Sequence, residues 1–191
     1  IASQDSTPRG LTFGSDGTKL FEIGLDSASI FESSLSTAFD LSTATFQQSI
    51  ATQNDFPSGL AFNTDGTKLF ETDRVSESIF ESSLSTAFDL STATFQQSFA
   101  TQDTTPEGLT FSPDGTKLFE IGFDSALIYE SSLSTAFDLS TATFQQSIAS
   151  QDSTPRGLTF GSDGTKLFET GEGSNLIYES TVGKSARFQL L

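Results

Sequence analysis

The sequence contains no histidine, cysteine, methionine or tryptophan among its 191 residues. Imidazole is the commonest general base and metal ligand near neutral pH, so its absence excludes a Ser-His-Asp triad and most zinc sites. Without cysteine the chain has no disulfide and no thiolate nucleophile. Its composition therefore does not indicate whether it resides in an oxidising or a reducing compartment. Because the chain starts at Ile1 and contains no methionine, we expect a processed protein or a piece of a longer one.

Positive charge is also scarce, since nine Lys and Arg face 25 Asp and Glu and the net charge is -16. Such a chain repels phosphate backbones, which excludes nucleic acid as an expected partner. The charge favours solubility and suits a salty medium that screens self-repulsion. No apolar run approaches the roughly 20 residues that cross a bilayer, so the sequence predicts no membrane span, and it shows no signal peptide.

One heptapeptide, DGTKLFE, occurs four times at a constant spacing. It begins at Asp16, Asp65, Asp114 and Asp163, so each copy lies 49 residues after the previous one. Every copy follows a Gly-Leu-(Thr/Ala)-Phe segment, which is itself preceded by a proline. A fixed period of this length is typical of a repeat architecture and outweighs any local signal.

Each repeat contains four short segments with the apolar or alternating character of β-strands. The turn between the first two, Ser15 to Thr18, contains Asp and Gly, which suit a tight hairpin. The connection Ser36 to Thr43 is rich in residues that cap their own backbone. No segment has a sustained helical period, so we expect almost no helix. The strands predicted in the first repeat are Gly10–Phe13, Lys19–Ile23, Ile30–Ser33 and Thr45–Ile50, the last with one buried face.

Four antiparallel strands in 40 to 50 residues are typical of a β-propeller blade. The sequence therefore predicts an all-β fold, a four-bladed β-propeller with one four-stranded antiparallel sheet per repeat of about 49 residues. Adjacent apolar pairs such as Leu20-Phe21 support this, because a middle strand of a blade is covered on both faces. A β-sandwich is the alternative, which the near-verbatim copying disfavours. We expect a single domain, closed as a ring with first strands lining a central channel, and blades at about 3–50, 51–99, 100–148 and 149–191.

The segments 106–119 (PEGLTFSPDGTKLF) and 134–142 (STAFDLSTA) resemble a known repeat. They are similar to the highly repetitive β-propellers of marine bacteriophages and marine bacteria, and more distantly to the blades of TolB-like and YVTN-type propellers. The resemblance covers essentially the whole chain. It implies near-identical blades that often serve as modules of virion or cell-surface proteins, with no catalytic residues to carry over. Where such repeats commonly have an aliphatic residue, this chain has Glu22, Glu71, Glu120 and Glu169.

Differences between the copies concentrate at two places. The first is the loop between the second and third strands, and the second is the residue after the proline. Loops that vary on a constant scaffold are common binding sites, so we treat these as candidate partner contacts. Drift at unconstrained surface positions is the alternative. The candidate loop residues are Leu25, Asp26, Arg74, Glu77, Phe123, Asp124, Glu172 and Asn175, and the residues after the proline are Arg9, Ser58, Glu107 and Arg156.

Two glutamates recur together in every repeat, Glu22 and Glu32 in the first. If they face each other across the hairpin, they would need a raised pKa, a cation such as Ca²⁺, or the nearby Lys19. A register shifted by one residue would instead place them on opposite faces. Four equivalent pairs also argue against a glycosidase, which needs one unique pair in a cleft. We therefore prefer solvated or edge-facing glutamates and predict no catalytic residue, cofactor or metal.

Two classes of function remain for such a chain. The first is a non-catalytic binding or adhesion module of a virion or extracellular surface protein, recognising a glycan or a protein. The second is a purely structural repeat unit of an extracellular or virion assembly, for which self-association would be expected. In either case the sequence predicts no enzymatic activity and an extracellular or virion-associated location.

Overall fold

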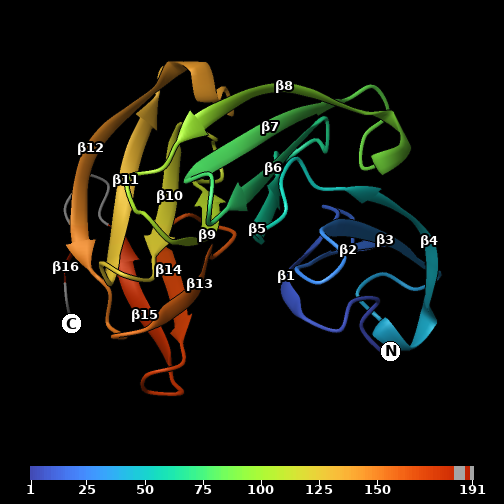
Figure 1. Ribbon diagram of the computed structural model, residues 1–191, viewed down its shortest axis with the longest axis horizontal. Coiled ribbons are helices and arrows are strands. Elements are labelled where there is room, and N and C mark those ends of the chain that lie inside the picture. The colour runs from blue at the N-terminus through green and yellow to red at the C-terminus, as the bar shows by residue number, and fades with distance from the viewer. Residues whose placement is uncertain (183–187, 190–191) are drawn as a thin grey trace. The chain divides into compact units, whose positions relative to one another are not determined.

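The computed structural model describes residues 1–182 and 188–189, and it contains sixteen β-strands in four sheets (Figure 1). Each sheet has four strands that follow one another in sequence order, and the strand pairs are antiparallel. Three one-turn 3-10 helices are the only helical segments in the described residues. The predicted class, an all-β chain of four β-propeller blades, is confirmed.

The strand bounds match the predicted segments to within about two residues at either end. Blade 1 contains β1 (Pro8–Phe13), β2 (Lys19–Gly24), β3 (Ser29–Leu35) and β4 (Ala44–Ala51). Blade 2 contains β5 (Pro57–Phe62), β6 (Lys68–Asp73), β7 (Ser78–Leu84) and β8 (Ala93–Ala100). Blade 3 contains β9 (Pro106–Phe111), β10 (Lys117–Gly122), β11 (Leu127–Leu133) and β12 (Ala142–Ala149). Blade 4 contains β13 (Pro155–Phe160), β14 (Lys166–Gly171), β15 (Ile177–Val182) and β16 (Phe188–Gln189).

The chain divides into two compact units, Ile1–Phe99 with blades 1 and 2 and Ala100–Leu191 with blades 3 and 4. Each unit is described by itself below, and ring closure and the single domain stay predictions. The sequence also predicts that a short connection at 181–185 and a strand at 186–191 replace the long connection and the fourth strand of the other repeats. Thr181 and Val182 belong to β15, so the connection does not begin at Thr181. Of the replacement strand only β16 is described, and it pairs with β15, while residues 183–187 and 190–191 lie outside the described part.

The DGT turn between β1 and β2 requires its glycine for two reasons. Gly17 has a φ of 73°, in the left-handed region where a side chain is strained. A Cβ there would also lie 2.4 Å from the ring of Phe39 in the connection before β4. Asp16 Oδ1 closes the turn by accepting hydrogen bonds from the amide of Thr18 at 2.8 Å and from its hydroxyl at 2.7 Å.

The polar connection after β3 caps itself, as predicted. The 3-10 helix η1 (Leu41–Thr43) begins after Asp40, whose Oδ1 accepts from the Ser42 amide at 3.0 Å and from its hydroxyl at 2.7 Å. Thr43 Oγ1 donates to the Asp40 carbonyl at 2.8 Å. The connection is therefore ordered by its own side chains, which explains why it is copied unchanged in blades 2 and 3.

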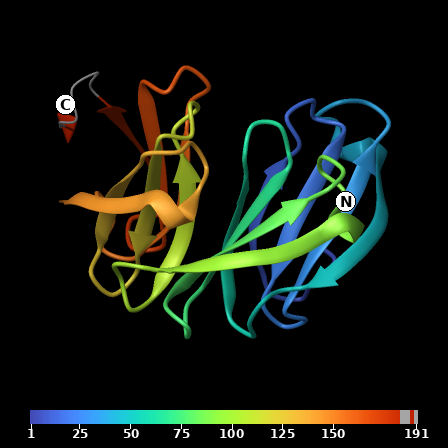
Figure 2. The same cartoon turned by 90° about the horizontal axis from the view of Figure 1, so that it is seen from above.

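The core lies between the two sheets of each unit, whose strands Figure 2 shows from above. In the first unit Phe21 and Ile30 of blade 1 are fully buried against Leu60 and Leu69 of blade 2. The Phe21 ring centre lies 4.5 Å from that of Phe62. In the second unit the equivalent cluster is Phe119, Ile121, Ile128 and Leu167. Leu69 and Phe70 of β6 are both buried, so this middle strand is covered on both faces, whereas Leu20 of β2 borders a cavity.

The outermost strand differs from the prediction that one of its faces is buried. Strand β4 has no fully buried residue, and Phe46 is 46% exposed. A bulge between Glu32 and Ser33 interrupts the pairing of β3 with β4. The outermost strand has a neighbour on one edge only, and alternation in sequence does not report how much of a face is covered.

Candidate functional site

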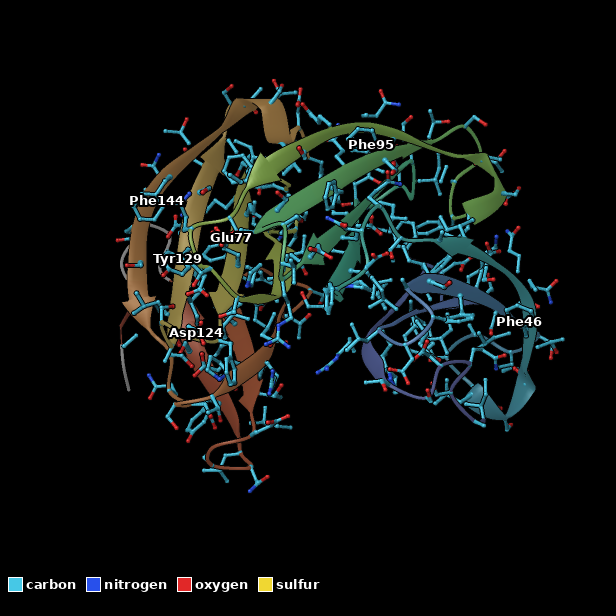
Figure 3. All side chains as sticks on the ribbon, viewed as in Figure 1. Phe46, Glu77, Phe95, Asp124, Tyr129 and Phe144 are labelled. Carbon is cyan, nitrogen blue, oxygen red and sulfur yellow. The ribbon has the colours of Figure 1, made fainter. Side chains whose placement is uncertain are left out.

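The candidate loops connect β2 to β3 and its equivalents, and all four have similar backbones. Each contains one non-glycine residue with positive φ: Ala28, Glu77, Ala126 or Asn175. Five candidate side chains belong to exposed residues and three are half-buried. The exposed residues are Asp26, Glu77, Asp124, Glu172 and Asn175, and the half-buried ones are Leu25, Arg74 and Phe123 (Glu77 and Asp124 are labelled in Figure 3).

A buried aspartate braces the loop of blade 1. Asp5, in the segment before β1, is 7% exposed and accepts from the amides of Thr7 at 2.7 Å, Asp26 at 3.3 Å and Ser27 at 2.9 Å. Burial raises the pKa of Asp5, but the hydrogen bonds from Ser27, Thr7 and Asp26 outweigh it and hold that pKa below the usual value. The carboxylate lies against Gly24, where a Cβ would meet Asp5 atoms at 2.3 Å.

In blade 2 the bracing carboxylate comes from another position in the chain. Asn54 stands where Asp5 stands in blade 1, and Asp73 stands where Gly24 does. Asp73 accepts from the amides of Phe56 at 2.8 Å, Val75 at 3.1 Å and Ser76 at 2.7 Å. These amides are the counterparts of those of Thr7, Asp26 and Ser27. The carboxylate has moved by 19 positions in the chain, yet it serves the same three donors.

The second unit repeats the arrangement of blade 1. Asp152 accepts from the amides of Thr154 at 2.8 Å, Gly173 at 3.0 Å and Ser174 at 2.9 Å. A hydrogen bond from the Ser174 hydroxyl is the largest cause that keeps the pKa of Asp152 far below its usual value. In blade 3, Asp103 accepts from Thr105 and a Cβ on Gly122 would lie 2.0 Å from its carboxylate. The Thr105 hydroxyl in turn accepts from the Asp124 amide at 3.0 Å, so in blade 3 the aspartate supports the loop through Thr105.

The structure brings both sets of variable positions together at the junction of blades 3 and 4. Arg156 donates through Nη1 to Glu107 at 2.5 Å and through Nη2 to Glu172 at 2.9 Å. Its guanidinium carbon lies 4.4 Å from the ring centre of Phe123. Glu107 is 3% exposed, so drift at an unconstrained surface is wrong for this position. The residue after the proline is a contact between blades.

In the first unit the residues after the proline, Arg9 and Ser58, have different surroundings from those in the second unit. Ser58 is 3% exposed and donates to Thr72 Oγ1 at 2.9 Å, within its own blade. Arg9 occupies the place that Arg156 has in blade 4, and its buried Nε has no hydrogen-bond partner.

The recurring glutamates do not face each other. In the β2–β3 register Phe21 pairs with Glu32 and Glu22 pairs with Phe31, so the two glutamates lie on opposite faces of the sheet. The hypothesis of a facing pair that binds a cation is therefore wrong. The expectation of solvated or edge-facing glutamates is wrong for six of the eight, such as Glu32 at 3% and Glu71 at 5% exposed. It holds for Glu179, which is exposed, and Glu22 is half-buried. Among the described residues no group of three acidic side chains could hold a metal ion.

Glu32 links the two blades of the first unit. Its Oε1 accepts a hydrogen bond from Lys19 Nζ at 2.6 Å. Its Oε2 accepts hydrogen bonds from Gln48 Nε2 at 2.7 Å and from the Leu90 amide of blade 2 at 3.0 Å. Lys19 also donates to the Phe88 carbonyl at 2.6 Å. Of the three partners considered for a facing pair, Lys19 is the one that Glu32 has, although the glutamates do not face each other, and both carboxylate oxygens have partners. This arrangement is a structural lock between sheets.

We expect Glu32→Ala to destabilise the first unit by about 3 kcal/mol, because it leaves a lysine and a buried amide without their acceptor. The matched control is Glu179→Ala in blade 4. That side chain is 48% exposed and bonds Lys166, so its loss is expected to cost less than about 1 kcal/mol. Urea unfolding of both variants checks this. Equal effects of the two substitutions would contradict the lock.

The second set of glutamates is buried near other acids. Glu71 Oε1 accepts from the Gln53 amide and Glu120 Oε1 from the Gln102 amide, each at 2.6 Å. Burial raises the pKa of Glu71 to about 7, and nearby Asp73 adds to the rise. Glu120 behaves alike, with a pKa of about 7. Such values suit general acid catalysis. The two residues are only 5% and 2% exposed, so substrate has no access to them.

Sequence reasoning missed a row of exposed aromatic rings on the outermost strands. Phe46, Phe95 and Phe144 are 44 to 47% exposed (Figure 3). Each lies about 6 Å from an aromatic ring on the next strand inward, such as Phe31 beside Phe46 at 6.4 Å. Their identical spacing in three repeats was the available signal.

These observations define a repeat protein of β-propeller blades with braced loops. No protein-family model matches the chain, and no curated protein matches it. Several solved structures, by contrast, match the chain. A functionally unknown protein from Desulfotomaculum acetoxidans is 14% identical with a TM-score of 0.67, and the match covers 100% of this chain and 56% of that one.

Two further solved structures are similar at the level of fold. A protein from Lactobacillus plantarum is 16% identical, with a TM-score of 0.66 and coverage of 96% and 56%. The periplasmic gluconolactonase PpgL of Pseudomonas aeruginosa is 17% identical, with a TM-score of 0.64 and coverage of 95% and 52%. The chain therefore spans about half the length of these proteins. In the described residues no helix is long and apolar enough to cross a membrane.

Proposed function

We propose that the chain is a non-catalytic binding module that recognises a protein or glycan surface through its β2–β3 loops and their equivalents. The observation that carries this is the relocated brace: blade 2 keeps the loop frame with Asp73 where blade 1 uses Asp5. A frame preserved by two different solutions, around outward residues that differ between blades, is what a recognition surface needs.

The loops offer an exposed carboxylate in each blade, at Asp26, Glu77, Asp124 and Glu172. With a net charge of -16, they favour a partner that presents cationic groups or sugar hydroxyls. The exposed rings of Phe46, Phe95 and Phe144 are each a second candidate contact, since sugar rings and apolar protein patches stack on aromatic side chains. The resemblance to marine phage propellers supports a virion or cell-surface setting.

The structural alternative is favoured by one observation, the Arg156 contacts with Glu107, Glu172 and Phe123. Some variable residues thereby specify which blade packs on which, and they are engaged without any partner. Against enzymatic activity, the chain has no histidine or cysteine, and its glutamates with raised pKa are buried. We expect no hydrolysis of gluconolactones by the purified chain.

The test compares two variants on glycan arrays and on panels of cationic proteins. One neutralises the loops (Asp26→Asn, Glu77→Gln and Asp124→Asn), and the matched control removes the outer rings (Phe46→Ala, Phe95→Ala and Phe144→Ala). We expect the loop variant to lose binding by tenfold or more, equivalent to about 1.4 kcal/mol, while the ring variant keeps it. The reverse result would move the site to the outer rings. No binding by the wild type to either panel would favour the structural alternative.

A further inference from the structure

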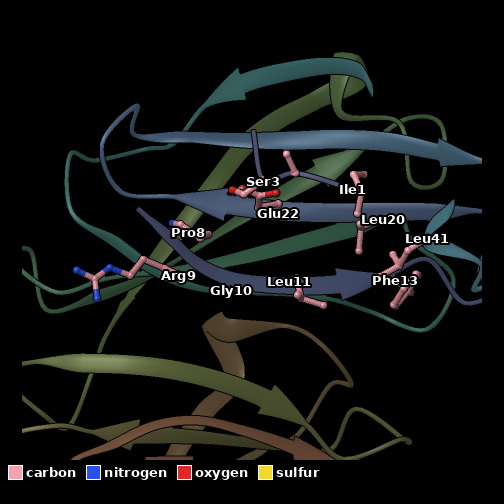
Figure 4. Close-up of a pocket in the computed structure, with 11 residues that line it drawn as sticks. Ile1, Ser3, Pro8, Arg9, Gly10, Leu11, Phe13, Leu20, Glu22 and Leu41 are labelled. Carbon is pink, nitrogen blue, oxygen red and sulfur yellow. The ribbon is translucent and has the colours of Figure 1, made fainter. Parts of the chain in front are cut away.

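One sheet face in the first unit has no covering blade. On blade 1 the side of β1 and β2 that carries Leu11, Phe13 and Leu20 borders a cavity of about 510 Å³, together with Leu41 (Figure 4). Leu11 is 67% exposed and Leu41 is 44% exposed. We call this the entry face of blade 1. An apolar surface of this kind on a soluble chain marks an interaction site.

The chain itself shows what covers an entry face. The same face on blade 2 contains Leu60 and Leu90, which are 7% and 1% exposed. It is covered by the opposite side of blade 1, the exit face, formed by Phe21, Ile23 and Ile30. Entry and exit faces are therefore complementary, and the repeats build them from the same residues.

The second unit provides a closer template. Residues 148–169, which include the entry face of blade 4, have the same sequence as residues 1–22. In that unit the exit face of blade 3, with Phe119, Ile121 and Ile128, covers Leu158 and Phe160. The entry face of blade 1 thus has the sequence of a face that demonstrably accepts a blade.

An open exit face is present at the other end of the chain. On blade 4 it consists of Phe168, Thr170 and Ile177, and Ile177 is 74% exposed. Leu176 beside it is 56% exposed. Blade 4 carries Thr170 where blade 1 has Ile23, and its Phe and Ile positions are unchanged.

Charge at this contact is mixed, because a covering blade 4 brings Glu172 to Arg9 but carries Arg156 where blade 3 has Glu107. At the junction of blades 3 and 4, Arg156 lies over Phe123, a residue from the loop of the covering blade. When blade 4 is the covering blade, the residue at that loop position is Glu172, and the arginine it meets on the entry face of blade 1 is Arg9. The Arg9 Nε is buried without a hydrogen-bond partner in the described residues. Arg156 Nε is likewise unpartnered at the covered junction, where the terminal nitrogens Nη1 and Nη2 meet the carboxylates, so the equivalent contact for Arg9 is between its terminal nitrogens and Glu172.

We propose that the entry face of blade 1 binds the exit face of blade 4 from a second copy of this chain. The contact is head-to-tail, so it closes into a ring or grows as a filament. The similar solved structures agree with this, because each is about twice as long as the part matched by this chain. The surface is distinct from the β2–β3 loops, and its test is independent of any loop partner.

The experiment is sedimentation velocity of the full chain from micromolar to sub-millimolar concentration, in salt that screens the net charge of -16. Wild type is expected to form dimers or larger species. Leu11→Asp on the entry face and Ile177→Asp on the exit face should each give monomers. Both positions are exposed, so thermal unfolding should stay within a few degrees of wild type.

Mixing the two variants tests directly whether an intact entry face binds an intact exit face. Each retains one intact face, so the pair should form a 1:1 dimer that grows no further. A monomeric wild type at every concentration would overturn the proposal, and so would variants that still associate or a mixture that stays monomeric. If blade 4 instead covers blade 1 of the same copy, the wild type would be monomeric at every concentration, and this result also overturns the proposal.

Discussion

The free energy of unfolding is expected to fall by roughly 3 kcal/mol in each unit as the pH rises from 5 to 8. The main causes are Glu71 in the first unit and Glu120 in the second, whose folded-state pKa is about 7 because burial disfavours the carboxylate. In the second unit Glu169 adds to the fall, since burial raises its pKa as well. The folded-state pKa lies above the unfolded value. The stabilisation is therefore complete below about 4.5 and is lost as the pH rises through 7.

The aspartates titrate outside the pH range in which this loss of stability is expected. The pKa values of Asp5, Asp16 and Asp152 are lowered from 3.8, so their contributions are present above that pH and are lost only in stronger acid. Maximum stability is therefore expected at mildly acidic pH, where the aspartates are charged and the two glutamates are protonated.

Urea unfolding at pH 5 and pH 8 measures the effect. Glu71→Gln should flatten the profile of the first unit, and Glu120→Gln should reduce the slope of the second unit, where Glu169 still contributes. Glutamine keeps the oxygen that accepts the Gln53 or Gln102 amide and cannot ionise. Glu22→Gln is the matched control, because the same repeat position is only half-buried in blade 1, and it should leave the slope unchanged. A wild type equally stable at both pH values would show that these carboxyl groups are ionised without cost.

The second large effect is a coupling between Asp5 and Gly24. Asp5→Asn should cost about 1–3 kcal/mol, because the charge is lost from hydrogen bonds with two loop amides and with the Thr7 amide. Gly24→Asp should cost a similar amount, because its Cβ would meet Asp5 atoms at 2.3 Å. The double variant reproduces the Asn54 and Asp73 combination of blade 2. It should return to within about 1 kcal/mol of wild type, a coupling of about 2–3 kcal/mol.

Chemical unfolding of the four proteins in this double-mutant cycle measures that coupling. The control combines Asp5→Asn with Gly171→Asp, whose own neighbour is Asp152 in blade 4. These two positions share no partner, so their effects should add. Additive effects in the Asp5 and Gly24 cycle would instead mean that the Asn54 and Asp73 combination of blade 2 depends on other differences, such as Phe56.

The sequence by itself determined the features that depend on residues close together in the chain. The 49-residue period, the Asp16-Gly17 turn and the self-capped connection at Asp40 are set by local hydrogen bonds and by the φ that glycine allows. Four strands, antiparallel and in order, follow from these turns. The class of fold could therefore be predicted without coordinates.

Only the tertiary structure decided on which face of its sheet each side chain lies and which residues of other blades it contacts. A shift of one residue in register moves a side chain through the sheet, so Glu22 and Glu32 could not be placed from spacing alone. The Glu32 lock to Leu90 and the Arg156 contact with Glu107 join residues 58 and 49 positions apart. Such contacts exist only once two sheets pack, because it is packing that removes water and makes an unpaired charge costly.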